Sequence, residues 1–219
     1  MVRTVTPAEP LLRRPLAPSD DVRLWYENAL QWPTVPGTPV RLAVGVRFDV
    51  LDVPVEAGRA ALEHLARSAA PGRGFPVALG GGRMRLLVAA GSAEELPGLL
   101  EWLDWGSLEL DLVAIGAGGL MDAPRPPGAA VVGSGARPLP LDRGGSQGVA
   151  VWLRPPEPGR GAGASLPTLS AMGARGDGDG PPDLVRLVNT VATQIHRVRL
   201  RRAGAAAAPR ADGQPLAFS

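Results

Sequence analysis

Two aspartates and a glycine-rich turn give this sequence the groups that metal–phosphate chemistry uses. Asp49 and Asp52 lie in the apolar stretch VGVRFDVLDVP, and a run of three glycines follows a helix-like segment further along the chain. Carboxylates at the end of a strand can hold divalent cations, and glycine backbone amides can approach a phosphate closely. The stretch from 44 to 88 therefore predicts a site for a metal ion or a phosphate group.

The glycine run can also be explained without a ligand. Glycine supplies the positive φ that a tight hairpin turn needs, and this interpretation is favoured by the spacing alone. The alternative is that the turn faces a phosphate, with the arginines that follow as its charged groups, because a guanidinium can bind two oxygens at once. The candidate phosphate- or nucleic-acid-binding residues are Gly80, Gly81, Gly82, Arg83 and Arg85.

A second cluster of positive charge stands at the end of the last predicted helix. Its members are Arg197, Arg199, Arg201 and Arg202. Cations at a helix C-terminus are stabilised by the helix dipole, so a solvated helix end is the simpler interpretation. A contact with nucleic acid or another acidic partner is the alternative.

Composition excludes several kinds of site. The chain of 219 residues has no cysteine and only two histidines, His64 and His196, so disulfides, thiolate chemistry and zinc sites built from Cys or several His are excluded. All 23 basic residues are arginine, but 21 acidic residues leave a formal net charge of only +2. This balance does not by itself argue for nucleic-acid binding.

Hydrophobic periodicity predicts an α+β fold. Period-3.6 patterns indicate helices, and apolar or alternating runs indicate strands. We expect a mostly antiparallel sheet with helices packed on it and a further helix at the C-terminus. A capping-box pattern at Ser92 and Glu95 marks one helix start. The predicted helices are 19–31, 56–69, 92–105 and 183–203, and the predicted strands are 40–53, 75–79, 84–89, 108–115 and 149–153.

Proline- and glycine-rich stretches divide the chain. We expect a flexible leader over 1–18, a domain over 19–153 with a variable loop at 128–148, a linker over 154–182, a packed helix over 183–203 and a disordered tail over 204–219. The N-terminus has no apolar signal-peptide region, and no window approaches the ~18 apolar residues of a membrane span. The expected location is the cytoplasm, without a membrane partner.

Four motifs give the chain a family resemblance. Over roughly 22–128 it resembles the N-terminal domain of bifunctional primase–polymerases (Prim-Pol), in the archaeo-eukaryotic primase superfamily, of which actinobacteria carry many short relatives. QWPTVP at 31–36 is similar to the family segment GWPV-P, and VLDVP at 50–54 to its first metal motif, D-x-D-P. GGGRM at 80–84 resembles the turn SGGRH, and GAGGLMDAP at 116–124 resembles GDGGYVVAP. The resemblance implies an RRM-like sheet.

The same resemblance locates departures at the catalytic positions. In such enzymes two carboxylates of the first motif and a third acidic residue hold divalent metals, while a histidine contacts nucleotide phosphates. Here Asp52 matches the first carboxylate, but Pro54 stands at the second and Met84 at the histidine. Counting back from the glycine turn places the third position at Val113, two residues after Asp111.

These departures leave Asp52 and Asp111 as catalytic remnants. Asp49, Asp52 and Asp111 are candidate metal ligands if their carboxylates lie about 4–6 Å apart. The odd spacing of Asp49 from Asp52, however, places it on the opposite face of a strand. The groove between Asp52, the hairpin at 80–85 and Asp111 is the candidate site.

The expected function is that of a catalytically degenerate module that binds nucleotide or DNA without polymerase activity. No cofactor is then required, and Mg²⁺ or Mn²⁺ enters only if a nucleotide site survives. The alternative is a regulatory scaffold for a protein partner without nucleotide binding, and the third is an active metal-dependent primase or polymerase. Fold resemblance does not decide among them, so the site must.

Overall fold

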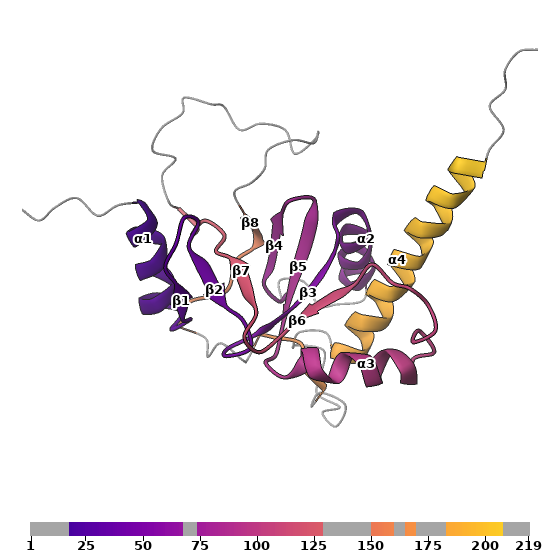
Figure 1. Cartoon of the computed structure of the whole chain (residues 1–219), viewed down its shortest axis with the longest axis horizontal. Coiled ribbons are helices and arrows are strands. Elements are labelled where there is room, and N and C mark those ends of the chain that lie inside the picture. The colour runs from indigo at the N-terminus through magenta and orange to yellow at the C-terminus, as the bar shows by residue number, and fades with distance from the viewer. Residues whose placement is uncertain (1–17, 68–73, 129–149, 160–164, 170–182, 208–219) are drawn as a thin grey trace, which may run out of the picture.

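The computed structural model describes residues 18–67, 74–128, 150–159, 165–169 and 183–207, and these form an α+β domain (Figure 1). The helices are α1 (Pro18–Leu24), the π-helical turn η1 (Trp25–Ala29), α2 (Val55–Ala66), α3 (Ser92–Trp102) and α4 (Leu184–Ala207). The strands are β1 (Thr34–Val35), β2 (Arg41–Ala43), β3 (Asp49–Pro54), β4 (Val77–Gly80), β5 (Arg83–Val88), β6 (Val113–Ile115), β7 (Leu120–Asp122) and β8 (Val151–Arg154).

The strands form two sheets. Five pair in the order β6-β3-β5-β4-β8, three pair in the order β1-β2-β7, and every pairing is antiparallel. The central pair, β3 and β5, runs in register from Asp49 opposite Val88 to Pro54 opposite Arg83. The predicted α+β class, with a mostly antiparallel sheet and a C-terminal helix, is confirmed.

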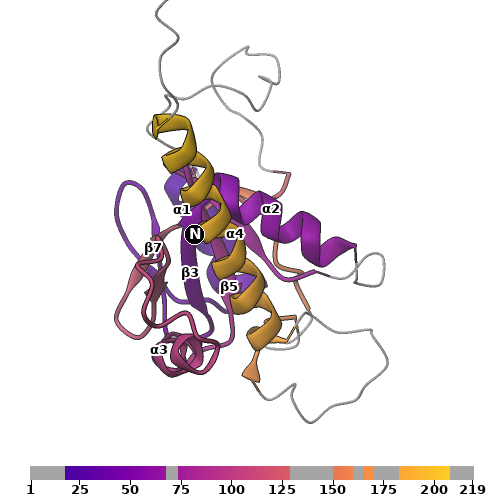
Figure 2. The ribbon, with the colours of Figure 1, turned by 90° about the vertical axis from the view of Figure 1, so that its right-hand side faces the viewer.

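Alternation along β3 separates two cores, because successive strand residues point to opposite faces. Leu51 and Val53 pack with α2, α3 and α4, where Leu187, Val188 and Val191 of α4 are buried. Figure 2 looks onto α4, which crosses in front of β3 and β5 with α2 beside it. The last helix therefore shares its buried side chains with the core on this face of the sheet. No described helix is long and apolar enough to cross a membrane.

The second core lies on the other face of the five-stranded sheet, toward β1, β2 and β7. Trp32 is buried there between Tyr26 and Phe48. The Tyr26 hydroxyl donates to the Pro124 carbonyl at 2.6 Å and accepts from the Trp152 indole at 3.0 Å. Burial raises the pKa of Tyr26 above its ordinary value, against the Trp152 hydrogen bond, which lowers it. This phenol is therefore a neutral structural group.

One predicted strand, 40–53, is wrong in its extent because the chain turns inside it. Gly45 has φ +89°, and a Cβ placed on it would lie 2.2 Å from the Cα of Ala117. Only glycine allows the turn at 116–118 to approach so closely. β2 and β3 consequently belong to different sheets.

The prediction of a strand over 108–115 is also wrong over most of its length. Only Val113–Ile115 forms a strand, and β7 at Leu120–Asp122 was not predicted. The preceding helix ends at Trp102 instead of Trp105, and Asp104 has the left-handed φ of +63°. The chain from 103 to 112 instead passes beside α4, where the Glu109 carbonyl accepts a hydrogen bond from Arg199 (Figure 1).

The remaining boundaries shift by a few residues. The first helix becomes α1 followed by η1 and ends at Ala29, α2 ends at Ala66, and α4 continues to Ala207, beyond its predicted end at 203. Most of the predicted leader, loop, linker and tail lies outside the described residues. Leu166, from the predicted linker, is buried in the second core, so that part of the segment belongs to the packed domain.

Candidate functional site

The sheet face opposite the helices carries a row of cross-strand neighbours at the level of Asp52. From β6 to β8 the paired residues are Val113, Asp52, Arg85, Ala78 and Trp152. Neighbours in register point to the same face of a sheet. Asp52 and Arg85 are therefore placed together by strand pairing, and Arg83 joins them from the same face two residues earlier on β5.

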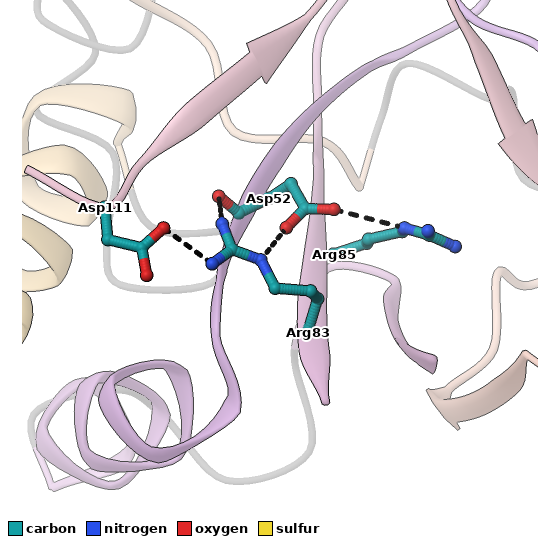
Figure 3. A network of polar contacts seen from close by, with 4 residues as sticks. All are labelled: Asp52, Arg83, Arg85 and Asp111. Atoms are coloured by element: carbon teal, nitrogen blue, oxygen red, sulfur yellow. Dashed lines mark hydrogen bonds and ion pairs between the residues drawn. The ribbon is translucent and has the colours of Figure 1, made fainter. Parts of the chain in front are cut away.

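Arg83 lies between two carboxylates (Figure 3). Its Nε donates to Asp52 Oδ1 at 2.5 Å, its Nη1 to Asp111 Oδ1 at 2.6 Å, and its Nη2 to the Asp52 carbonyl at 3.0 Å. Every nitrogen of the guanidinium is thus engaged within the chain. A single cation holds the two carboxylates that the sequence indicates as catalytic remnants.

Charges balance within this network, which we call the sheet-face network: Asp52, Arg83, Arg85 and Asp111. Burial alone would lower the pKa of Arg83, but the hydrogen bonds and charges of Asp52 and Asp111 outweigh it, and the pKa lies above its ordinary value. Arg83 therefore stays charged across the range in which proteins are handled. Two cations and two anions leave no net charge.

Arg85 is only partly satisfied. Its Nε donates to Asp52 Oδ2 at 3.3 Å, and its terminal nitrogens have no acceptor among the described residues. Figure 3 shows its guanidinium directed away from Asp52. The guanidinium lies near the hairpin, since a Cβ placed on Gly80 would be 3.7 Å from Arg85 Nη1. Of the two arginines predicted to face phosphate, Arg83 has an acceptor at each of its three nitrogens, whereas both terminal nitrogens of Arg85 lack an acceptor among the described residues.

The predicted metal triad is not assembled. Asp49 lies on the helix side of the sheet, where its Oδ2 accepts the backbone N–H of Ala93 at 2.9 Å. No group of three His, Cys, Asp or Glu side chains suited to a metal ion occurs in the part of the chain that the structure describes. Asp49 is separated by the alternation of β3, while Asp52 and Asp111 share Arg83.

Asp49 also replaces the predicted capping box of α3. The N-cap residue is Gly91, with φ +91°, and it has no side chain to accept a hydrogen bond. Because the first N–H groups of a helix need acceptors, the buried Asp49 carboxylate serves from the neighbouring strand. Its role in the structure is to join β3 to α3.

Met84 does not lie at the candidate site, contrary to the motif comparison. It is fully buried in the helix-side core, beneath Gly58 of α2, where an added Cβ would come 2.5 Å from the Met84 sulfur. Alternation along β5 sends residue 84 to one face and Arg83 and Arg85 to the other. A side chain at 84 is therefore on the wrong face to meet a ligand of the sheet-face network.

The three glycines form the predicted hairpin. Gly81 and Gly82 have φ of +60° and +75°, and β4 and β5 pair on either side of them. Positive φ at both central positions is what tight hairpin turns require. Gly80 is the last residue of β4, opposite Arg83.

The four arginines of the basic helix end lie in the last turns of α4. Arg202 pairs with Glu56 at 2.9 Å and Arg201 with the same carboxylate at 3.6 Å. Arg199 donates to a backbone carbonyl, and the exposed Arg197 has no acidic partner among the described residues. One carboxylate therefore compensates this end of the helix only in part.

A groove that sequence reasoning missed lies between α4 and the segment before β6. Its volume is about 420 Å³. The lining residues are Pro54, Glu109, Leu110, Asp111, Ile195, Val198, Arg199 and Arg202. In the sequence, only the arginine spacing of the last helix indicated this groove. The other wall of the groove comes from residues 109–111, which were predicted to belong to a strand.

Comparison with family models, curated proteins and solved structures finds no match for this chain. Its function must therefore be argued from the chemistry of the site.

Proposed function

We propose that this chain is a non-catalytic module that binds the phosphates of a nucleotide or of single-stranded nucleic acid at the sheet-face network of its five-stranded sheet. The observation that carries the proposal is the different engagement of two neighbouring arginines. Arg83 lies between two carboxylates, whereas the terminal nitrogens of Arg85 have no acceptor in the part of the chain that the structure describes. The proposal agrees with a Prim-Pol relationship in which the scaffold is kept and the chemistry is lost.

The bridged carboxylates argue against metal-dependent nucleotidyl transfer. Such catalysis needs acidic side chains that hold divalent cations close to the reacting phosphate. Here a divalent cation would have to displace Arg83 from Asp52 and Asp111, with loss of two charge-assisted hydrogen bonds. Asp49, the remaining candidate ligand, is committed to the start of α3.

The surroundings of Arg85 suit an oxyanion. Its side chain is 18% exposed, so its charge is less screened than that of a surface arginine. Asp52 fixes the guanidinium through Nε and leaves the terminal nitrogens for a ligand. The small residues Ala78 and Gly80 of β4 lie alongside, and Val113 of β6, 53% exposed, offers apolar surface on the same face.

Binding of a fluorescein-labelled single-stranded oligonucleotide, followed by fluorescence anisotropy at low salt, tests the proposal. Arg85→Ala should weaken binding about tenfold, since a charged hydrogen-bonded contact contributes roughly 1.5–3 kcal/mol. Arg41→Ala is the matched control, because Arg41 is an exposed arginine in the other sheet. It should change affinity less than about twofold, and wild-type affinity should fall as salt rises. Absence of wild-type binding, or equal effects of the two variants, would contradict the proposal.

A regulatory interaction scaffold is the second candidate, and the surface of α3 favours it. Trp102 is 66% exposed there, among the exposed acidic residues Glu94, Glu95, Glu101 and Asp104. The stretch 86–124 contains no basic residue. An exposed tryptophan in an acidic field suits a basic protein partner better than a nucleic acid.

A further inference from the structure

We infer that the groove beside α4 is a second binding site, adjacent to the sheet-face network, for a small organic phosphate that carries a flat apolar ring. The groove and the sheet-face network share one residue, Asp111, which lines the groove and accepts a hydrogen bond from Arg83. Its volume of about 420 Å³ falls in the usual range of small-molecule sites. The inference does not depend on Arg85.

One part of the groove is apolar. Ile195 and Val198 come from α4 and are almost completely buried, and Leu110 and Pro54 complete the surface from the neighbouring segments. Side chains that line the groove and are also packed in the core have little freedom to move, so they form a rigid apolar surface against which the ring of a ligand can pack. This is the part that would hold the base of a nucleotide.

Two arginines lie at the other part. Arg199 Nη1 donates to the Glu109 carbonyl at 2.8 Å, which positions its side chain at the groove without neutralising its charge. Arg202 also lines the groove and is paired with Glu56 on α2. A phosphate between these two guanidinium groups would receive charge-assisted hydrogen bonds from both.

Glu56 already supplies an anion at this place. Its carboxylate contacts Arg202 at 2.9 Å and Arg201 at 3.6 Å, and all three side chains are about half exposed or more. Exposed ion pairs are weak, so a phosphate can displace the Glu56 carboxylate as the partner of Arg202. Glu56 is thus an internal competitor, and Glu56→Gln should raise the affinity for a phosphate ligand about threefold.

Isothermal titration calorimetry with three probes tests the site: AMP, adenosine and inorganic phosphate. AMP should bind more tightly than either part alone. The double variant Arg199→Ala, Arg202→Ala should weaken AMP binding about tenfold or more, while Arg41→Ala should stay within about twofold of wild type. Both arginines are exposed, so the double variant should keep the wild-type circular dichroism spectrum. Glu109→Gln is the control for Glu56→Gln. It also removes a negative charge from a residue near the arginines, but the Glu109 side chain forms no ion pair with α4 among the described residues.

The outcomes separate the two sites. If AMP binding is lowered by Arg85→Ala and not by the double variant, the groove inference is overturned and the sheet-face proposal is supported. The groove alone is supported if the double variant weakens AMP binding while Arg85→Ala leaves both AMP and oligonucleotide binding unchanged. No AMP binding to wild type overturns the groove inference. A gain with Glu109→Gln as large as that with Glu56→Gln overturns the competitor role of Glu56.

Discussion

Asp52→Ala is expected to lower the free energy of unfolding by about 3 kcal/mol, measured by urea denaturation. Asp52 is 13% exposed and is the acceptor for both arginines of the sheet-face network. Its removal leaves two partly buried cations without their shared carboxylate, and breaking a buried pair from one side costs roughly 3–5 kcal/mol. We place the effect at the lower end because both arginines retain some contact with solvent.

Asp111→Ala is the matched comparison for this change. Asp111 pairs with Arg83 alone and its side chain is 58% exposed, so its loss should cost at most about 1 kcal/mol. If the two variants are equally stable, Asp52 does not organise the network and the account of the site is wrong.

Arg83→Ala is expected to create a Mn²⁺ site at Asp52 and Asp111, where Arg83 takes the place of a metal ion in the wild-type protein. Without the guanidinium, Asp52 and Asp111 face the space that one cation occupied. Carboxylate oxygens are ligands for hard divalent cations, and so few of them should give a dissociation constant of about 1 mM. Loss of the free Mn²⁺ signal in electron paramagnetic resonance titrations measures it.

Arg85→Ala serves as the control for this gain, because it removes an arginine from the same strand and leaves Arg83 between the carboxylates. It should bind no more Mn²⁺ than wild type. Equal Mn²⁺ affinity in wild type and Arg83→Ala would mean that Arg83 does not occupy the position of a cation. Asp52 and Asp111 would then again be candidate metal ligands in the wild-type protein.

Local patterns were sufficient to predict the regular part of this fold. The hairpin of β4 and β5 follows from two apolar runs around three glycines, and α4 follows from a sustained period of 3.6. The alternation of β3 was also enough to separate Asp49 from Asp52. These features depend on neighbours in sequence, which periodicity detects.

The rest depends on contacts between distant segments. The chain turns at Gly45 because the turn at 116–118 packs against it, and no pattern in 40–53 shows that approach. The segment before β6 resembles a strand in composition but is held beside α4 through the Glu109 carbonyl. The wall that this segment forms in the groove beside α4 therefore had no local signature.

The pairing of charges was the least predictable part of the site. Arg83 and Arg85 are equivalent in sequence, two residues apart on one strand, and both were expected to face phosphate. The structure distinguishes them because Asp111 reaches Arg83 only. Whether an arginine is a binding group or an internal counter-ion depends on which carboxylates the fold brings to it.

The dependence of oligonucleotide binding on divalent cations tests the central claim most directly. In the proposed module arginine supplies the positive charge that a metal would supply in a polymerase, so the affinity for single-stranded DNA should be kept in EDTA. Added Mg²⁺ should leave that affinity unchanged or lower it, as a competing counterion. Binding that appears only with Mg²⁺ or Mn²⁺ and is abolished by Asp52→Asn would contradict the account.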